Sequence, residues 1–337
     1  MKKTARIPLI SSLAVGLLGA PALSEAVEFG IQPRVETGFT YYKFKQERGA
    51  GTAISNVNGV PVAAANAAQG AVKLEDTMPF LGAGLTFFAD RFFIDLNGQK
   101  AFNGEDDGNQ QISTFSTFNG NTSSTVQDIK RDTDFDRTEY AISAGYSITD
   151  RLAAYAGYKW AYTNSEADFV DTILNNNAVI FEDGSAVFVN RVSRLTGDLD
   201  VEVAENGPFI GITYGWEIKQ GFFDGVLSAN FAVAHLDSRI RQKLSNQVST
   251  LTSASINGIP VPVAGTPESL PDNRVGNIDG TTTGFTVGIG WRGFTPVKGL
   301  TYSLGIQGYT YDFDSHDALG EYEETAVTYK VGVAYTF

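Results

Sequence analysis

The chain has no cysteine, and it has only two histidines among 337 residues. Disulfide bonds, thiolate metal sites and cysteine nucleophiles are therefore excluded. Positive charge is also scarce, because 25 lysines and arginines face 38 aspartates and glutamates. The resulting net charge of −13 argues against a nucleic acid as a partner, since nucleic-acid-binding proteins present basic surfaces.

Long apolar runs are missing as well. No segment after residue 26 is continuously apolar over the roughly eighteen residues that a transmembrane helix needs, so a helical membrane protein is excluded. A transmembrane β-barrel is not excluded, because its strands are apolar only at every second residue. The sequence also has no P-loop, dinucleotide fingerprint, zinc motif or nucleophile elbow, so we expect no cofactor.

The N-terminus has the order of a secretory signal peptide. Lys2, Lys3 and Arg6 precede an apolar core over 9–18, and small residues follow it. We expect cleavage after Ser24 or Ala26, which leaves a signal peptide of residues 1–26 and one mature domain, 27–337. The mature chain then carries a net charge near −15, because residues 1–26 hold three positive side chains and one negative.

Segments of about eleven residues alternate strictly between apolar and polar or small residues, the pattern of strands with two different faces. In the segment 138–148, for example, Tyr140, Ile142 and Tyr146 share one face, whereas Glu139 and Ser143 share the other. Eleven residues at about 3.3 Å each, tilted by about 40°, rise roughly 28 Å, which matches the hydrocarbon thickness of a bilayer.

We therefore predict an all-β fold, a closed antiparallel transmembrane β-barrel of about ten strands, with eight or twelve as alternatives. Short turns should lie on the periplasmic side and long loops outside, over 47–77, 104–134, 165–205, 241–280 and 314–324. Asn58-Gly59 and Asn257-Gly258 predict small hairpins inside two of these loops. The predicted strands are 29–46, 78–89, 91–103, 135–148, 151–164, 206–218, 223–240, 281–294, 299–313 and 325–337.

Aromatic residues stand at the ends of the apolar faces, where membrane proteins carry their interfacial girdles. The predicted girdle residues are Trp160, Tyr162, Trp216, Trp291 and Tyr335. The last strand ends on Phe337, which resembles the C-terminal signature that hands outer-membrane proteins to their assembly machinery. The resemblance implies a Gram-negative outer-membrane location and contact with that machinery during biogenesis.

If the apolar residues face lipid, the alternate residues face the lumen. The inward charges are then four positive and four negative, which predicts a lumen filled by ion pairs: Arg34, Glu36, Asp95, Glu139, Lys159, Glu217, Arg292 and Lys330. The arrangement resembles the transmembrane domain of outer membrane protein A and its small-barrel relatives. A narrow conductance, in which the pairs exchange partners, remains the alternative.

Two further interpretations concern the outside. Arg239, Arg241 and Lys243 continue an outward row above the membrane, where they are either a solvated rim or contacts for lipopolysaccharide phosphates. Ten strands also resemble the omptin proteases, which use an Asp/His dyad. His235 and Asp237 stand in the reverse order of that dyad, and the apolar alternation of their strand places both on the outward face.

The residues thus favour a non-enzymatic, monomeric surface barrel that anchors long acidic loops for envelope integrity or ligand and lipopolysaccharide interaction. A narrow porin for small solutes is the first alternative, and an omptin-like protease is the second. Asp132, Asp134 and Asp136 alternate along one strand face, but they lack the other residues of a calcium loop, so we predict no metal site.

Overall fold

The computed structural model describes the chain in ten stretches. These are 29–47, 52–57, 60–65, 72–118, 121–180, 186–219, 224–256, 259–261, 268–315 and 321–337. The predicted signal peptide and its cleavage site lie outside the described residues. Among the residues described, no helix is long and apolar enough to cross a bilayer.

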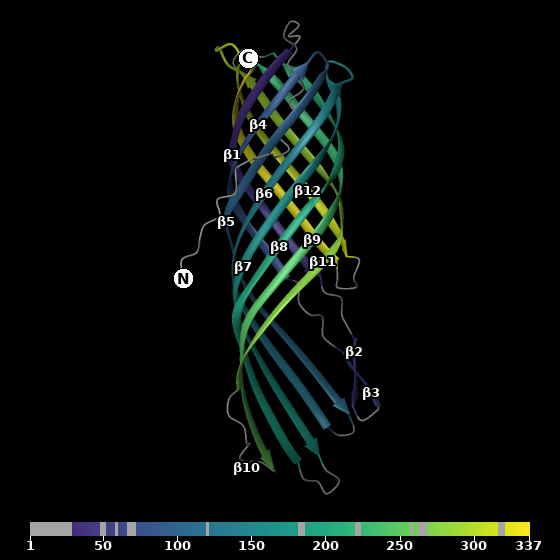
Figure 1. Cartoon of the computed structure of the whole chain (residues 1–337), viewed down its shortest axis with the longest axis vertical. Helices are drawn as coiled ribbons and strands as arrows, with labels where there is room; N and C mark the ends of the chain where they lie inside the picture. The colour runs from purple at the N-terminus through teal and green to yellow at the C-terminus, as the bar shows by residue number, and fades with distance from the viewer. Residues whose placement is uncertain are drawn as a thin grey trace.

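Ten antiparallel strands close into a tall barrel, which confirms the predicted fold class and strand count (Figure 1). Neighbouring strands follow the order β9-β11-β12-β13-β1-β4-β5-β6-β7-β8, and pairing of β8 with β9 closes the ring. The strands are β1 (Phe29–Glu47), β4 (Val72–Ala89), β5 (Phe92–Phe118), β6 (Asn121–Ser147), β7 (Leu152–Ile180), β8 (Ala186–Ile218), β9 (Gly225–Ile256), β11 (Glu268–Phe294), β12 (Leu300–Ser315) and β13 (Glu321–Tyr335).

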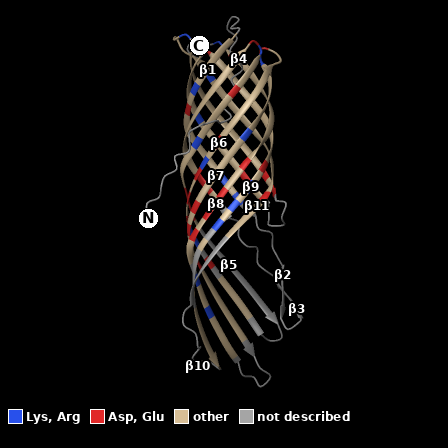
Figure 2. Cartoon of the chain, viewed as in Figure 1, with Lys and Arg blue, Asp and Glu red and all other residues tan. Residues whose placement is uncertain are grey.

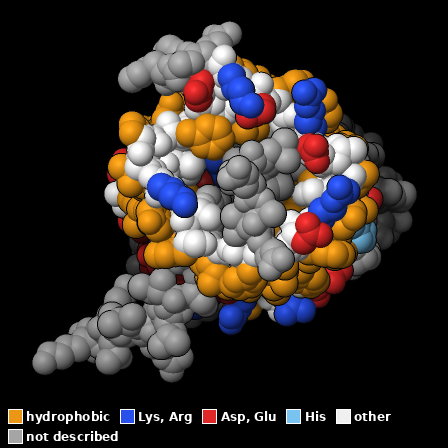
Figure 3. Space-filling view, turned by 90° about the horizontal axis from the view of Figure 1, so that it is seen from above, with side chains coloured by type: hydrophobic (Ala, Val, Ile, Leu, Met, Phe, Trp, Pro, Cys, Tyr) orange, Lys and Arg blue, Asp and Glu red, His pale blue; other side chains and the backbone are white. Residues whose placement is uncertain are grey.

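Short turns join the strands at one end of the barrel, which also holds the C-terminus (Figure 1). Two residues separate β4 from β5, and the connections from β6 to β7 and from β11 to β12 are nearly as short. We call this end periplasmic, because outer-membrane barrels keep their short turns on that side. Seen from this end, lysine, arginine and acidic side chains stand around the mouth of the barrel (Figure 3).

Both predicted hairpins form beside the Asn-Gly pairs, which themselves lie outside the described residues. β2 (Thr52–Val57) pairs with β3 (Val60–Ala65) in a separate sheet of two strands. β10 (Ile259–Val261) folds back onto the end of β9. Neither hairpin enters the closed wall, so the alternative of twelve strands is not realised.

The prediction of long loops over 104–134, 165–205 and 241–280 was largely wrong, because strands continue through most of these segments. β7 and β8, for example, pair without interruption from Leu152 opposite Tyr214 to Ile180 opposite Ala186. Once a strand leaves the membrane, both of its faces meet water, so the apolar alternation disappears while backbone pairing persists.

Six strands therefore extend beyond the other four as an open sheet, which fans out at the lower end of Figure 1. One row of paired residues marks its beginning, and it runs through Glu105, Asp134, Glu166, Asp200, Lys243 and Val275. We call the segments beyond this row the outer sheet: 106–118, 121–133, 167–180, 186–199, 244–256 and 268–274.

Solvent exposure alternates along the barrel strands as the sequence pattern predicts. On β8, Ile210 and Ile212 are 66% and 51% exposed, whereas Thr213 is 1% exposed. Val331 and Val333 on β13 and Leu81 on β4 are about half exposed in the same way. So wide a surface of bare aliphatic and aromatic side chains is typical of a membrane-embedded band.

The barrel interior is packed with side chains rather than empty. Its buried apolar members include Tyr42, Met78, Phe80, Phe135 and Leu236, none of which is more than 4% exposed. Tyr42 and Phe135 lie with their ring centroids 5.9 Å apart. The interior therefore combines the predicted polar groups with an aromatic and aliphatic filling that the charge pattern alone does not predict.

Candidate functional site in the barrel interior

A bidentate ion pair links β1 to β5 inside the barrel. Arg34 donates from its two terminal nitrogens to the two carboxylate oxygens of Asp95, at 2.7 and 2.9 Å. Thr86 accepts a further hydrogen bond from Arg34 at 2.8 Å, and Asn97 donates to Asp95 at 2.8 Å. Such charge-assisted, paired hydrogen bonds fix orientation as well as energy, so Arg34 and Asp95 hold each other firmly.

Glu36 lies between two cations at looser distances. One of its carboxylate oxygens is 3.6 Å from Nε of Arg34, and the other is 3.7 Å from Nζ of Lys330. Lys330 also donates to the side-chain oxygen of Gln307 at 3.4 Å. Glu36 and Lys330 are both buried, so their contacts are electrostatically important although they exceed ordinary hydrogen-bond lengths.

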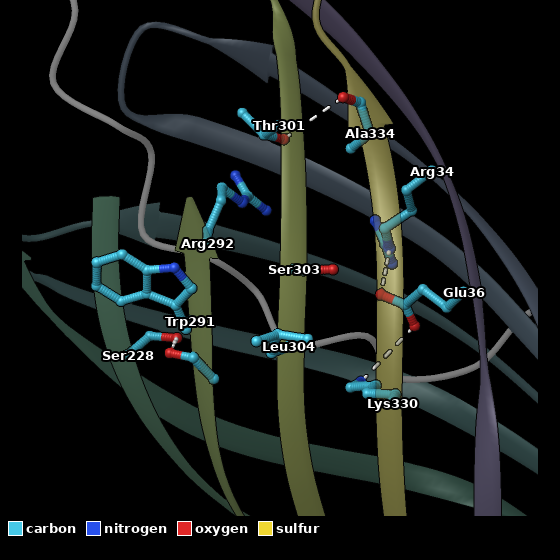
Figure 4. Close-up of a pocket in the computed structure, with 11 residues that line it drawn as sticks. Arg34, Glu36, Ser228, Trp291, Arg292, Thr301, Ser303, Leu304, Lys330 and Ala334 are labelled. Carbon is cyan, nitrogen blue, oxygen red and sulfur yellow. Dashed lines mark hydrogen bonds and ion pairs between the residues drawn. The ribbon is translucent and has the colours of Figure 1, made fainter. Parts of the chain in front are cut away.

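Arg292 lies on β11 across a cavity from these groups (Figure 4). Ser303 on β12 and Ser228 on β9 also line this cavity. Dashed lines in Figure 4 join Arg34 to Glu36 and Glu36 to Lys330, whereas none reaches Arg292. We call Arg34, Glu36, Asp95, Arg292 and Lys330 the periplasmic cluster.

A second cluster forms around Arg137 on β6, which is 2% exposed. Its guanidinium lies 2.8 Å from Glu139, 3.2 Å from Glu205 and 2.7 Å from Glu324. These carboxylates come from β6, β8 and β13, so one arginine joins three strands across the interior. The three acids would repel one another without this central cation.

Aromatic hydroxyls and rings complete the second cluster. Tyr309 donates to Glu324 at 2.8 Å and lies 3.1 Å from Glu139. The ammonium of Lys159 is 3.4 Å from Glu139, and it lies over the rings of Tyr309 and Tyr311 at 4.5 and 5.1 Å. We call Arg137, Glu139, Lys159, Glu205 and Glu324 the outer cluster.

The structure brings together seven of the eight charges that the alternation assigned to the lumen. Six are buried, and Arg292 is partly exposed to the cavity. Glu217 is a correction: it is exposed and pairs with Lys219 at 2.9 Å. The reason is its place one residue before the end of β8, where the strand reaches water at the periplasmic rim.

Three members of the outer cluster were missed: Arg137, Glu205 and Glu324. Each has the same parity as inward residues of its own strand, so the signal was present in the sequence. Glu205 and Glu324 lie one residue before the predicted strand starts at 206 and 325. With them included and Glu217 removed, the two clusters hold five positive and five negative side chains.

The predicted girdle residues lie on the outer wall at two levels. Trp216, Trp291 and Tyr335 lie within a few residues of the periplasmic strand ends, whereas Trp160 and Tyr162 lie nine and eleven residues beyond Arg151 toward the other end. Trp216 is 42% exposed. Phe337 donates its backbone N–H to the carbonyl of Ile31 at 3.0 Å, which ties the last strand to the first.

Arg239, Arg241 and Lys243 point outward on β9 and are exposed. Each faces a carboxylate on a neighbouring strand, namely Asp279 at 2.8 Å, Glu202 at 3.8 Å and Asp200 at 3.3 Å. The hydrogen bond to Asp279 raises the pKa of Arg239. In Figure 2, basic segments of the strands lie beside a group of acidic ones at the level where the outer sheet begins.

The residues considered for catalysis do not converge. His235 and Asp237 point outward, and the ring of His235 contacts the hydroxyl of Thr283 at 2.9 Å. Asp132, Asp134 and Asp136 also face outward, and no metal-binding group of three or more such residues occurs in the described part of the chain.

Solved structures with a similar outline are outer-membrane barrels of several kinds. The outer membrane protease OmpT from Escherichia coli is 10% identical, with a TM-score of 0.47, covering 93% of this chain and 99% of that one. A Pseudomonas aeruginosa FadL homologue is 8% identical, with a TM-score of 0.26, covering 92% and 90%. No protein-family model matches the sequence, and no curated protein matches it either.

These distant likenesses carry no functional argument. The class follows from the molecule itself: a closed ring of tilted antiparallel strands, a bare apolar band and aromatic residues at both of its edges. The chain has the fold of a small Gram-negative outer-membrane β-barrel.

Proposed function

We propose that the chain is a non-enzymatic surface protein of the outer membrane, in which a filled barrel anchors an acidic β-sheet outside the cell. The observation that carries this proposal is the occupied interior. Two ion-pair clusters and a layer of aromatic side chains cross the lumen where a porin would keep an aqueous channel.

Opening this interior would be costly. Arg137 would have to leave three carboxylates, and removing one partner from a buried charge cluster typically costs about 3–5 kcal/mol. Tyr309 would also lose its hydrogen bonds to Glu139 and Glu324. A permanently plugged barrel serves as a rigid base, which suits a protein whose working surface lies outside the membrane.

The outer sheet provides that surface. Three paired rows of outward side chains cross β6, β7 and β8 at its base, and eight of their nine members are acidic. The members are Asp132, Asp134, Asp136, Asn164, Glu166, Asp168, Asp198, Asp200 and Glu202. Like charges placed directly opposite one another destabilise a sheet, so a structural role alone does not account for them.

The basic row on β9 supports lipopolysaccharide as a partner at the same level. Arg239, Arg241 and Lys243 form ion pairs with exposed carboxylates. Such surface ion pairs contribute little to stability, so a phosphate group can take the place of the carboxylates. Arginine binds phosphate with two parallel hydrogen bonds. The outer leaflet would present its phosphate groups to this row in the proposed orientation.

Planar-bilayer recording tests the filled barrel. We expect purified mature protein to show no steady openings, because the two clusters block the path. Parallel gels must show heat-modifiable migration, so that an absence of conductance can be assigned to a folded barrel. Reproducible openings of folded protein would refute the proposal and favour a narrow porin, and specific peptide cleavage would favour an omptin-like protease.

Binding to lipopolysaccharide tests the basic row. The triple variant Arg239→Gln, Arg241→Gln, Lys243→Gln should bind at least about tenfold more weakly, since it loses several charge-assisted hydrogen bonds to phosphate. A matched control replaces Arg91, Arg151 and Lys298 in the periplasmic turns with Gln. Equal binding by both variants, or unchanged binding to dephosphorylated lipopolysaccharide, would refute the contact.

A further inference from the structure

The interior cavity at the periplasmic end has an excess of positive charge. Three cations of the periplasmic cluster, Arg34, Arg292 and Lys330, face two carboxylates, Glu36 and Asp95. The outer cluster shows the opposite imbalance, with two cations and three carboxylates. The lumen is therefore balanced as a whole but polarised between its two clusters.

The carboxylates of the periplasmic cluster are already engaged. Asp95 accepts hydrogen bonds from both terminal nitrogens of Arg34 and from Asn97, so its carboxylate has little capacity left to accept further hydrogen bonds. Glu36 is shared between Arg34 and Lys330 at 3.6 and 3.7 Å. Arg292 is the remaining cation, and among the described residues its guanidinium donates no hydrogen bond and forms no ion pair.

Cationic and hydroxyl-bearing side chains line the cavity around Arg292. Arg292 approaches the cavity from β11, and Lys330 approaches from β13 on the other side (Figure 4). Ser303 on β12 lies between them, whereas Ser228 lines the cavity from β9 and donates its hydroxyl to the carbonyl oxygen of Gly290 at 3.3 Å. The cavity is open at its mouth, and cations outnumber carboxylates on its walls.

We propose that this cavity binds a small inorganic oxyanion, with Arg292 and Lys330 as the principal contacts and inorganic phosphate as the representative ligand. A tetrahedral oxyanion can accept two parallel hydrogen bonds from the guanidinium and one from the ammonium. Its charge would offset the excess positive charge, which is expensive to keep in an enclosed interior. This proposal is independent of the lipopolysaccharide contact, which lies at the other end of the barrel.

The ligand reaches the site from the periplasm. The outer cluster and the aromatic filling close the lumen on the other side, and Arg292 lies two residues before the end of β11 at Phe294. A small soluble anion fits this route better than a lipid headgroup, because the apolar faces of the same strands point away from the cavity into the membrane.

Isothermal titration of the detergent-solubilised mature protein with inorganic phosphate, at constant ionic strength, tests the proposal. We expect one saturable site in the parent protein and at least about tenfold weaker binding in Arg292→Gln. Arg292→Lys should retain part of the affinity, because it keeps the charge but loses the paired geometry. Lys298→Gln, in the adjacent periplasmic turn, is the matched control and should bind as the parent does.

Thermal unfolding supplies a second readout, since a ligand that binds only the folded state raises the melting temperature. Phosphate should stabilise the parent and Lys298→Gln but not Arg292→Gln. If Arg292→Gln does not fold, Lys330→Gln and Arg292→Lys carry the test. Absence of saturable binding by the parent, or equal binding by Arg292→Gln and Lys298→Gln, would overturn the proposal.

Discussion

At the scale of single residues, Arg137 is the side chain on which most of the interior depends. It is 2% exposed and contacts three carboxylates from three strands. Arg137→Met keeps an unbranched side chain in the space but leaves Glu205 and Glu324 without their cation. We expect the free energy of unfolding to fall by about 3–5 kcal/mol, measured by urea titration of the protein in lipid vesicles.

Two further variants show whether charge causes that loss. Adding Glu324→Gln to Arg137→Met removes one of the two carboxylates left without a cation, so the free energy of unfolding should partly recover. Arg241→Gln removes an arginine from an exposed pair on the outer wall, where the contribution is about 1 kcal/mol or less. An equal loss from Arg241→Gln, or no recovery in the double variant, would show that lost packing and not unpaired charge destabilises the barrel.

Residue parity was the most informative sequence signal at this scale. It assigned Arg34, Glu36 and Lys159 to the interior, because a charged side chain on a membrane-spanning strand avoids the lipid and therefore faces the lumen. Parity did not indicate at which residue each strand enters or leaves the barrel wall. Glu205 was therefore missed just beyond a predicted end, and Glu217 was assigned to an interior that the strand had already left. Partner choice, such as Arg137 with Glu324, depends on strand stagger and was not predictable.

At the scale of elements, the pairing of β1 with β13 is the seam between the first and last strands of the barrel. Gly38 lies in this seam opposite Lys330, with φ of 158°, and a Cβ added there would collide with the carbonyl oxygen of Tyr329. Because the obstacle is backbone, it cannot move without disturbing the ladder. Gly38→Ala should lower stability by about 1–3 kcal/mol.

The same barrel offers a matched glycine for comparison. Gly276 lies on β11 near the base of the outer sheet, and a Cβ added there would meet no atom within 4 Å. Gly276→Ala should leave the unfolding midpoint and the fraction of heat-modifiable protein unchanged. If both alanine variants behave alike, close approach of β1 and β13 does not limit the closure of the barrel.

Element ends were the least predictable part of the fold. Four short turns were located within a few residues, since turn residues interrupt two strongly alternating strands. The far ends gave no such signal. β8 runs for 33 residues, and its outer part mixes polar and apolar residues on both faces, so periodicity could not distinguish it from a loop. Pairing with β7 and β9 on both sides maintains this part as a strand.

At the scale of the whole molecule, the closed barrel and the outer sheet divide along one row of paired residues. Both ion-pair clusters lie on the periplasmic side of that row, together with the apolar band. Beyond it, six strands pair with one another, the short β10 pairs with the end of β9, and Asp106 accepts a hydrogen bond from the backbone N–H of Glu75 on β4 at 3.2 Å. This division implies that the barrel folds without the outer sheet.

A truncated barrel tests that implication. Asn-Gly turns would join Glu105 to Asp134, Glu166 to Asp200 and Lys243 to Val275, which are directly paired residues and so suit two-residue hairpins. We expect insertion into vesicles, heat-modifiable migration and an unfolding midpoint close to that of the full chain, because every contact of Arg34 and Arg137 within the two clusters is retained. Failure to insert would mean that the outer sheet takes part in assembling the barrel, and the filled interior alone would then not be sufficient to close it.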